Sequence, residues 1–440
     1  MLLYNTANPS QTTNFENAVF QGLADGNGLF MPSGFHRFDA DFFKRLPHLS
    51  FSEMATEVIQ AWIGDEVPYS VIKEICEEAF NFHVPLVKLN ENIQILELFH
   101  GPSLAFKDFG ARFMSRIMAH FNLKRNKNLH ILVATSGDTG GAVAMGFHNI
   151  PGMQVSILFP KNRVSKYQEV QLTCLGGNIN AYEVDGSFDD CQAMVKLALS
   201  DRDFSEKEGL ASANSINIAR LIPQSLYYFK AWADIQRQSP GAEVIFSVPS
   251  GNFGNICAGA FAWKMGLPIK KLIASVNANR VFTDYLLSGK MAPKSSLATL
   301  SNAMDVGNPS NFVRIEQLFG NVENVKELLS SYSFSDAETE EAELEIYNQY
   351  GYLSEPHAAV GYLGLKKYFA ESGGNEKGVF LGTAHAAKFI PVLPKELSSQ
   401  VILPDSILGL MNKTPSKLNI GTDFEEFKKI ILNQSQHNQV

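Results

Sequence analysis

The stretch EVIFSVPSGNFGNICAGAFAWKMG (residues 243–266) shows the pattern on which this chain is built. An apolar, β-branched run ends at Val248, a loop rich in Gly, Ser and Asn follows, and a helical period starts near Ile256. The same order of strand, polar loop and helix recurs at residues 129–147, 153–172 and 377–390. From residue 93 onward this alternation predicts an α/β architecture with a largely parallel sheet. Polar loops after parallel strands lie at one edge of a sheet, so we expect these four loops to converge on one crevice.

The loop within the first stretch is a candidate anion site. It consists of Ser250, Gly251, Asn252, Phe253, Gly254 and Asn255. Glycines let the backbone approach a ligand closely, and the N–H groups at a helix start attract a phosphate. The loop contains no Lys or Arg and matches neither GxxxxGK[ST] nor GxGxxG, which favours a cofactor monophosphate over a nucleotide triphosphate or NAD. A tight turn without a ligand is the alternative interpretation.

Lys107 is a candidate nucleophile because its neighbours are apolar. It follows the turn residues Gly101 to Ser103 and stands beside Phe106. Desolvation disfavours an ammonium ion, so a lysine held near a helix start in such surroundings has a lowered pKa and becomes a usable amine. The helix itself is predicted by four apolar residues at intervals of four: Phe109, Phe113, Ile117 and Phe121. A lysine that snorkels from an amphipathic helix is the alternative.

Two further loops carry hydroxyl groups. The loop in residues 129–147 contains Ser136, Gly137, Asp138 and Thr139, donors that suit the α-carboxylate of an amino acid, with Asp138 as a cap or an ammonium partner. In FLGTAHAAKF, Thr383 directly follows a strand, where a neutral hydroxyl would suit a pyridine nitrogen. A plain capping loop is the alternative for the first of these. His385 and His357 are candidates for catalysis or for helix capping.

Composition and charge favour a small-molecule enzyme. The chain has 440 residues, of which 45% are hydrophobic and 19% charged, and its net charge is −8 without a sustained basic run. These values predict large buried cores and argue against a nucleic-acid or anionic-membrane surface. Four dispersed cysteines indicate neither a metal site nor a disulfide framework. No signal peptide or membrane span is recognisable, so we expect a soluble, cytoplasmic protein, monomeric or homodimeric.

The chain is expected to divide into three parts. Residues 1–92 are predicted to be mostly helical, residues 93–390 to form the catalytic core, and residues 391–440 to form a helical tail. The acidic stretch DAETEEAELE (336–345) is interpreted as a solvated helix face.

Eleven segments in order resemble the threonine synthase family, whose members are fold-type II pyridoxal-phosphate enzymes with a tryptophan synthase β-like fold. They span nearly the whole chain: LYNTAN, GLFMPSG, IGDEVP, LELFHGPSLAFKDFGARF, ATSGDTGGAVA, LGGNI, SANSINIARL, SVPSGNFGN, LSNAMDV, SEPHAAV and FLGTAHAAKF. Two departures are small: Ser103 stands where the family commonly has Thr, and Ala386 where it commonly has Pro. The resemblance implies two open α/β domains, the smaller one mobile and spanning about residues 128–205, after a mostly helical N-terminal segment.

The resemblance also implies the activity and the roles of the candidate residues. The expected reaction is the conversion of O-phospho-L-homoserine and water to L-threonine and phosphate, by γ-elimination followed by β-addition of water. Lys107 would carry pyridoxal 5'-phosphate, residues 250–255 would hold its phosphate, and Thr383 would face its ring nitrogen. The loop from Ser136 to Thr139 would bind the substrate carboxylate. For the substrate phosphate the nearest basic candidates are Lys161, Arg163 and Lys166.

Two other functions remain open at this point. A Ser/Thr dehydratase or a β-replacing synthase would use similar loops, but it would not explain the first 90 residues or the segment around Lys107. A non-catalytic sensor of phosphometabolites would be expected to lack the reactive lysine, which is present here.

Overall fold

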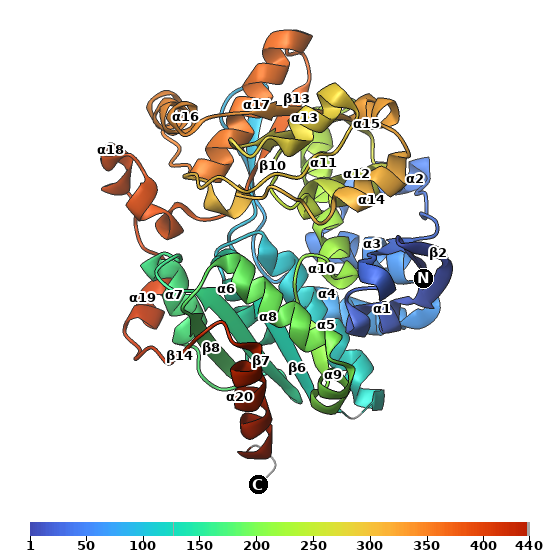
Figure 1. Cartoon of the computed structure of the whole chain (residues 1–440). Coiled ribbons are helices and arrows are strands. Elements are labelled where there is room, and N and C mark those ends of the chain that lie inside the picture. The colour runs from blue at the N-terminus through green and yellow to red at the C-terminus, as the bar shows by residue number, and fades with distance from the viewer. Residues whose placement is uncertain (126, 438–440) are drawn as a thin grey trace.

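Within residues 1–125 and 127–437, which the computed structural model describes, the strands form three β-sheets. Figure 1 shows the two larger sheets in separate halves, with β10 and β13 above and β6, β7 and β8 below. The third sheet belongs to the N-terminal segment, drawn in blue at the right of the view. The predicted α/β fold class is confirmed.

The N-terminal segment combines helices with a small antiparallel sheet in the order β2-β1-β3. Its elements are β1 (Leu2–Asn5), β2 (Asn8–Asn14), α1 (Phe15–Gln21), β3 (Phe30–Pro32), α2 (Ala40–Arg45), α3 (Phe51–Ile63) and α4 (Tyr69–Ala79). The segment touches both halves: Phe38 N–H donates to Met265 O at 3.0 Å, and Glu16 pairs with Arg125 at 2.9 Å. It therefore bridges the two larger sheets.

The upper sheet has the order β12-β11-β10-β13-β5-β4 and is parallel except for β4. Its strands are β4 (Leu86–Lys88), β5 (Ile93–Glu97), β10 (Val244–Pro249), β11 (Ile269–Val276), β12 (Leu329–Ser333) and β13 (Lys377–Gly382). The longer helices in this half are α11 (Leu226–Gln238), α12 (Gly254–Lys264), α13 (Val281–Ser288), α14 (Phe312–Phe319), α15 (Val322–Leu328), α16 (Asp336–Tyr350) and α17 (Pro356–Ser372). The central strands β10 and β13 are almost wholly buried, as expected for a parallel sheet covered on both faces.

The lower sheet is parallel throughout, in the order β14-β8-β7-β6-β9. Its strands are β6 (Leu129–Ala134), β7 (Met153–Pro160), β8 (Ile179–Val184), β9 (Leu210–Ser212) and β14 (Leu418–Ile420). Its helices are α5 (Lys107–Arg125), α6 (Asp138–Phe147), α7 (Lys166–Thr173), α8 (Phe188–Ser200), α9 (Arg202–Glu208), α10 (Ile218–Leu221) and α20 (Phe424–His437). The helix predicted from the apolar period after Lys107 is confirmed, because Phe109, Phe113, Ile117 and Phe121 are all buried in α5.

The last fifty residues contain a β-strand as well as helices. Besides α18 (Lys395–Ser398), α19 (Asp405–Met411) and α20, they supply β14, which runs parallel to β8 at the edge of the lower sheet. Phe427 and Ile431 of α20 pack into the same core cluster as β8. The proposed division at residues 92 and 390 stays a prediction.

The acidic stretch in α16 is solvated only in part. Most of its carboxylates are exposed, but Glu343 is wholly buried and neither of its oxygens has a hydrogen-bond partner within the described residues. Burial, with a contribution from Glu355, raises the pKa of Glu343 to about 9. The interpretation of the stretch as a solvated face is wrong at this residue, because a buried apolar neighbour, Ala342, shows that one side of α16 faces the core.

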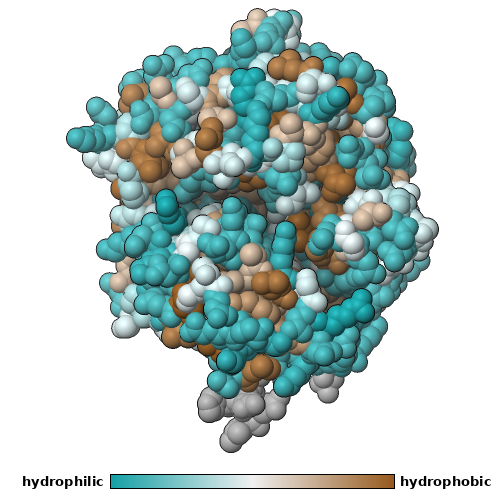
Figure 2. Space-filling view, viewed as in Figure 1, coloured by the Kyte–Doolittle hydropathy of each residue, from teal (hydrophilic) through white to brown (hydrophobic). Residues whose placement is uncertain are grey.

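On the face seen in Figure 2, hydrophobic residues form separate brown areas in a mainly hydrophilic surface. Across the described residues, no helix combines the length and the apolar character needed to cross a membrane. The four cysteines are buried and none is paired in a disulfide.

Candidate active site

Lys107 and Thr383 are brought together by backbone pairing between two distant segments. Phe106 N–H donates to Thr383 O at 2.8 Å, and His385 N–H donates to Leu104 O at 3.1 Å. These bonds flank an isolated antiparallel bridge between the segments, one before α5 and one after β13. Lys107 and Thr383, the predicted amine and the predicted hydroxyl, therefore belong to two segments that lie side by side where the two halves meet.

The Lys107 side chain is only partly buried, whereas its neighbours Ala105 and Phe109 are wholly inaccessible. Its Nζ lies 5.8 Å from the ring centre of Phe106, and within the described chain it forms no ion pair or hydrogen bond. Burial lowers the pKa of the Lys107 amine to about 8; nearby Asp138 opposes this shift, while Lys388 and Arg220 add to it. The amine is thus unpaired, and at physiological pH a larger share of it is neutral than in an ordinary lysine.

The loop of residues 250–255 joins β10 to α12. Ser250 N–H donates to Ser275 O at 2.9 Å, and Phe253 adopts a left-handed conformation with φ of 60°. Helix α12 begins at Gly254, two residues earlier than expected. Asn252 anchors the loop on both sides: its Nδ2 donates to Ser215 Oγ at 2.7 Å, and its Oδ1 accepts from Ser310 N–H at 2.6 Å.

The backbone of this loop leaves donors free. Among the described residues, no hydrogen bond is made by the N–H groups of Gly251, Asn252, Phe253, Gly254 and Asn255. These groups stand at the amino end of a buried helix, where the helix dipole adds partial positive charge. A side chain at Gly251 would place its Cβ 2.6 Å from Met304 Cα, so the loop can adopt this path only with glycine there. The arrangement suits a phosphate.

The loop before α6 is organised differently. Thr135 Oγ1 accepts from Gly137 N–H at 2.9 Å and from Gly140 N–H at 2.8 Å, so the loop uses its own hydroxyl to satisfy its donors. The hydroxyls of Ser136 and Thr139 are partly exposed and form no hydrogen bond within the described residues. They remain available to a ligand.

Asp138 is not a side-chain helix cap, and its ammonium partner comes from the protein. Its Oδ1 lies 2.7 Å from Lys388 Nζ and accepts from Gln168 Nε2 at 3.0 Å. Burial by itself would raise the pKa of this carboxyl, but the ammonium groups of Lys388 and Lys107 hold it well below its ordinary range. Asp138 is therefore ionised.

The basic residues after β7 lie on the surface. Lys161 Nζ is 3.7 Å from Asp185 Oδ2, and Arg163 is exposed without a side-chain partner among the described residues. Lys166 is the first residue of α7 and is exposed as well. Within the described residues, no hydrogen bond or ion pair joins any of the three to Lys107 or Thr383.

Two buried cations near Lys107 were not assigned roles from the sequence. Lys388 is wholly buried, and Arg220 is 1% exposed, with Nη1 donating to Ala213 O. The only sequence signal for Arg220 was a single basic residue within the apolar stretch INIARLI. Both histidines have structural partners: His385 Nδ1 accepts from Ala387 N–H at 3.1 Å as a cap, and His357 pairs with Glu355 at 2.5 Å.

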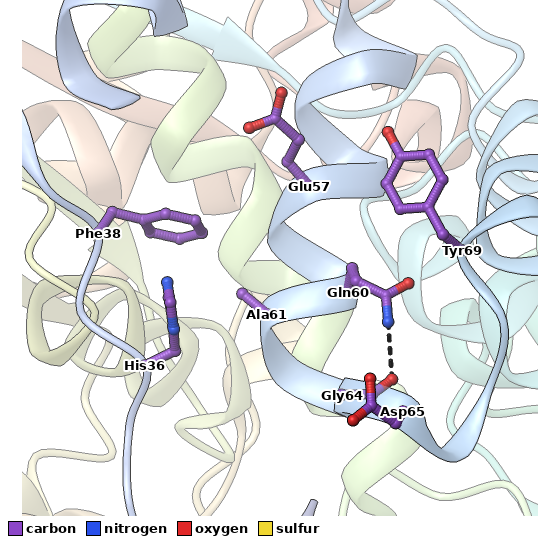
Figure 3. A pocket seen from close by; sticks show the side chains of 8 residues that line it. All are labelled: His36, Phe38, Glu57, Gln60, Ala61, Gly64, Asp65 and Tyr69. Atoms are coloured by element: carbon purple, nitrogen blue, oxygen red, sulfur yellow. Dashed lines mark hydrogen bonds between the residues drawn. The ribbon is translucent and has the colours of Figure 1, made fainter. Parts of the chain in front are cut away.

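A separate, open pocket of about 420 Å³ lies in the N-terminal segment. Figure 3 shows His36 and Phe38 on one side of it, facing Glu57, Gln60 and Tyr69. None of the candidate site residues lines it, so it offers no alternative location for the chemistry.

Comparison with known proteins identifies relatives along the whole chain. The family model of pyridoxal-phosphate dependent enzymes matches residues 83–383, and the model of the threonine synthase N terminus matches residues 3–80. The chain is 44% identical over 435 residues to threonine synthase from Haemophilus influenzae, covering 98% of this chain and 100% of that relative.

Solved structures agree. The crystal structure of threonine synthase from Escherichia coli superposes with a TM-score of 0.91 at 40% identity, covering 99% of this chain and 100% of that one. The structure of PLP bound threonine synthase from Brucella melitensis gives a TM-score of 0.91 at 32% identity and covers 98% of both chains.

Proposed function

The chain belongs to the threonine synthase family of pyridoxal-phosphate-dependent enzymes, and from this membership we propose which of its residues carry the reaction. It is a lyase that converts O-phospho-L-homoserine and water to L-threonine and phosphate. The observation that carries our assignment is the unpaired Lys107 amine, held beside Thr383 by the hydrogen bond from Phe106 N–H to Thr383 O.

The residues present fit pyridoxal phosphate. The free N–H groups of residues 251–255 suit its phosphate, Lys107 offers an amine to its aldehyde, and the Thr383 hydroxyl, unbonded within the described residues, suits its ring nitrogen. Lys388 is an unsuitable carrier, because its ammonium is already bound to Asp138. When bound, the cofactor supplies a conjugated ring that withdraws electrons from the substrate's α-carbon.

Lys107 then moves the protons. Once the substrate amine has displaced it, Nζ is a free base that removes the proton from the substrate's Cα. The same amine would then remove a proton from Cβ as phosphate leaves Cγ, and would supply a proton to Cγ. One water adds its oxygen to Cβ, and the proton at Cα is restored. A pKa near 8 suits both directions of transfer, because the amine and the ammonium are both populated at working pH.

Substrate recognition is proposed for the loop before α6. The free hydroxyls of Ser136 and Thr139, at the amino end of that helix, would donate to the α-carboxylate, and Gly137 lets the backbone approach it. The negative charge of Asp138 is neutralised by Lys388 and does not repel an anion strongly. For the substrate phosphate we keep Lys161 and Arg163, which follow β7; movement of the smaller domain, about residues 128–205, would bring them over the site.

The dehydratase alternative is less well supported. The N-terminal segment matches the threonine synthase N terminus and packs against both halves of the molecule, so it belongs to the catalytic architecture. We also propose that the enzyme acts in the cytoplasm, as a monomer or homodimer, on a small molecule and without nucleic acid; the unpaired cysteines support a reducing compartment.

The function is tested by measuring the ratio of the two products. The full chain, supplied with pyridoxal phosphate and O-phosphohomoserine, is expected to yield threonine and phosphate in equal amounts. Borohydride reduction followed by peptide mapping should place the cofactor on Lys107, and K107R should remove both label and activity. A main product of 2-oxobutyrate would favour the dehydratase, and a label on Lys388 would refute the assignment of Lys107.

A further inference from the structure

Lys388 occupies a position that is unusual for a lysine. It is wholly buried, and its Nζ contacts two groups: Asp138 Oδ1 at 2.7 Å and Ser103 O at 2.9 Å. Its own carbonyl accepts from Ser165 Oγ at 3.0 Å, which ties it to the start of α7. The side chain therefore crosses from the loop after β13, in the upper half, to the amino end of α6, in the lower half.

The Asp138 carboxylate is bonded to the Lys388 ammonium and also interacts electrostatically with Lys107. Three charged side chains of the described chain act on the Lys107 amine: Asp138 from α6, Arg220 from α10 and Lys388 from the turn after β13. Asp138 is the only anion of the three. The neighbouring Asp108 accepts from Ser103 N–H through Oδ2 at 2.9 Å, while its buried Oδ1 has no hydrogen-bond partner within the described residues. Burial raises the pKa of this carboxyl to about 6.

We propose that Lys388 is a positioning residue for Lys107: by holding the Asp138 carboxylate, it prevents that carboxylate from pairing with the Lys107 amine. The inference rests on the proposed role of Lys107 and extends it. A buried carboxylate that loses its partner takes the nearest cation, because an uncompensated charge in the interior is strongly unfavourable. Lys107 is the other cation that acts on Asp138, so we expect it to take the place of Lys388.

Pairing with Asp138 would disable Lys107 in two ways. An ion-paired ammonium is not a nucleophile, so attachment of the cofactor would slow. The amine would also be drawn toward α6 and away from Thr383. The loss of the bond to Ser103 O is less important, because Gln171 Nε2 also donates to that oxygen, at 3.0 Å.

The test measures the basicity of Lys107 directly in the full chain without cofactor. The rate at which acetic anhydride labels Lys107, followed by peptide mass spectrometry against pH, gives the midpoint of its titration. Wild type is expected near pH 8. K388M should raise the midpoint by one unit or more and slow the capture of pyridoxal phosphate at pH 7.5 by about tenfold. The double variant K388M/D138N should return the midpoint to the wild-type value or below.

K230M is the matched control, since it removes a lysine from an ion pair with Asp234 on α11, and neither residue is among the charges that act on Lys107. It should leave the midpoint unchanged. An unchanged midpoint in K388M, or an equal rise in the double variant, would overturn the proposal. If K388M does not fold, D138N alone must lower the midpoint. Failure of wild type to capture the cofactor at Lys107 would instead refute the proposed function.

Discussion

The loops at residues 135–140 and 250–255 share one backbone plan and differ in how their donors are used. Each follows a buried parallel strand and starts a helix. In the first, Thr135 accepts two of the loop's N–H groups and Asp138 is paired with Lys388. In the second, the loop carries no charge, and the N–H groups of residues 251–255 are left free within the described residues. The side chains thus decide whether a helix start is satisfied internally or remains open to an anion.

The largest effect is expected from closing the open loop. In G251V, Cβ would meet Met304 Cα at 2.6 Å, and this backbone atom cannot move aside as a side chain can, so the loop must shift. We expect cofactor retention to weaken at least ~100-fold, measured as loss of the visible absorption band on gel filtration. G34A is the control, because nothing lies within 4 Å of the added Cβ. Full retention in G251V would show that the phosphate binds elsewhere.

A smaller effect is expected when a carboxylate is introduced into the neutral loop of residues 250–255, as Asp138 provides in the loop of residues 135–140. N252D keeps an oxygen to accept from Ser310 N–H, and Ser215 Oγ can turn to donate to it. The added carboxylate should repel a phosphate by about 2 kcal/mol, which weakens retention roughly 30-fold. N8D makes the same change on an exposed strand and should have no effect. Equal retention in N252D and wild type would contradict the proposed phosphate cradle.

A change in the loop of residues 135–140 should weaken substrate binding and leave cofactor retention unchanged. Gly137 has φ of 137°, and an added Cβ would lie 2.6 Å from the Gln168 amide, so G137A must distort the loop before α6. We expect kcat/KM to fall about tenfold, mainly through KM, while the visible band is retained. Steady-state kinetics on O-phosphohomoserine measures this. Loss of the cofactor with unchanged KM would reverse the roles given to the two loops.

The smallest effect is expected at Thr383, which is hydrogen-bonded to the segment before Lys107. T383V removes the hydroxyl but keeps the backbone bond from Phe106 N–H to Thr383 O. A hydrogen bond to a neutral ring nitrogen contributes little, so kcat should fall about threefold with retention unchanged. T383S should restore kcat. A fall of 100-fold or more would indicate a full pyridinium partner instead.

The sequence was informative where a signal is local. The start of α5 at Lys107, its four buried aromatic and aliphatic residues, and the strand-loop-helix units all follow from periodicity within about twenty residues. The Lys388–Asp138 pair was not predictable, because its partners lie 250 positions apart and burial of each depends on the other. Of the two roles expected for Asp138, helix cap or ammonium partner, the cap is wrong because α6 begins at Asp138 itself and Gly137 is its N-cap; the ammonium bonded to it is that of Lys388.

Two other features had no readable pattern. Strand β2 is polar and mostly exposed, so the small N-terminal sheet left no alternation of apolar residues to detect. Glu343 lies within a run of exposed acidic residues, and its burial results from the packing of α16 against α17. Periodicity predicts which face of an element is apolar. It does not predict that a polar residue on that element is buried.

The pairing of β5 with β13 also determines when the site can form during synthesis. Ile93 lies opposite Gly378, so β5 must wait for almost the entire catalytic core to be made before it acquires that neighbour. Until then its edge is an unpaired template for other chains, and Lys107 lacks the segment that carries Thr383. We therefore expect the yield of active enzyme to depend on what happens to the chain between the synthesis of these two strands, and not only on the stability of the finished fold.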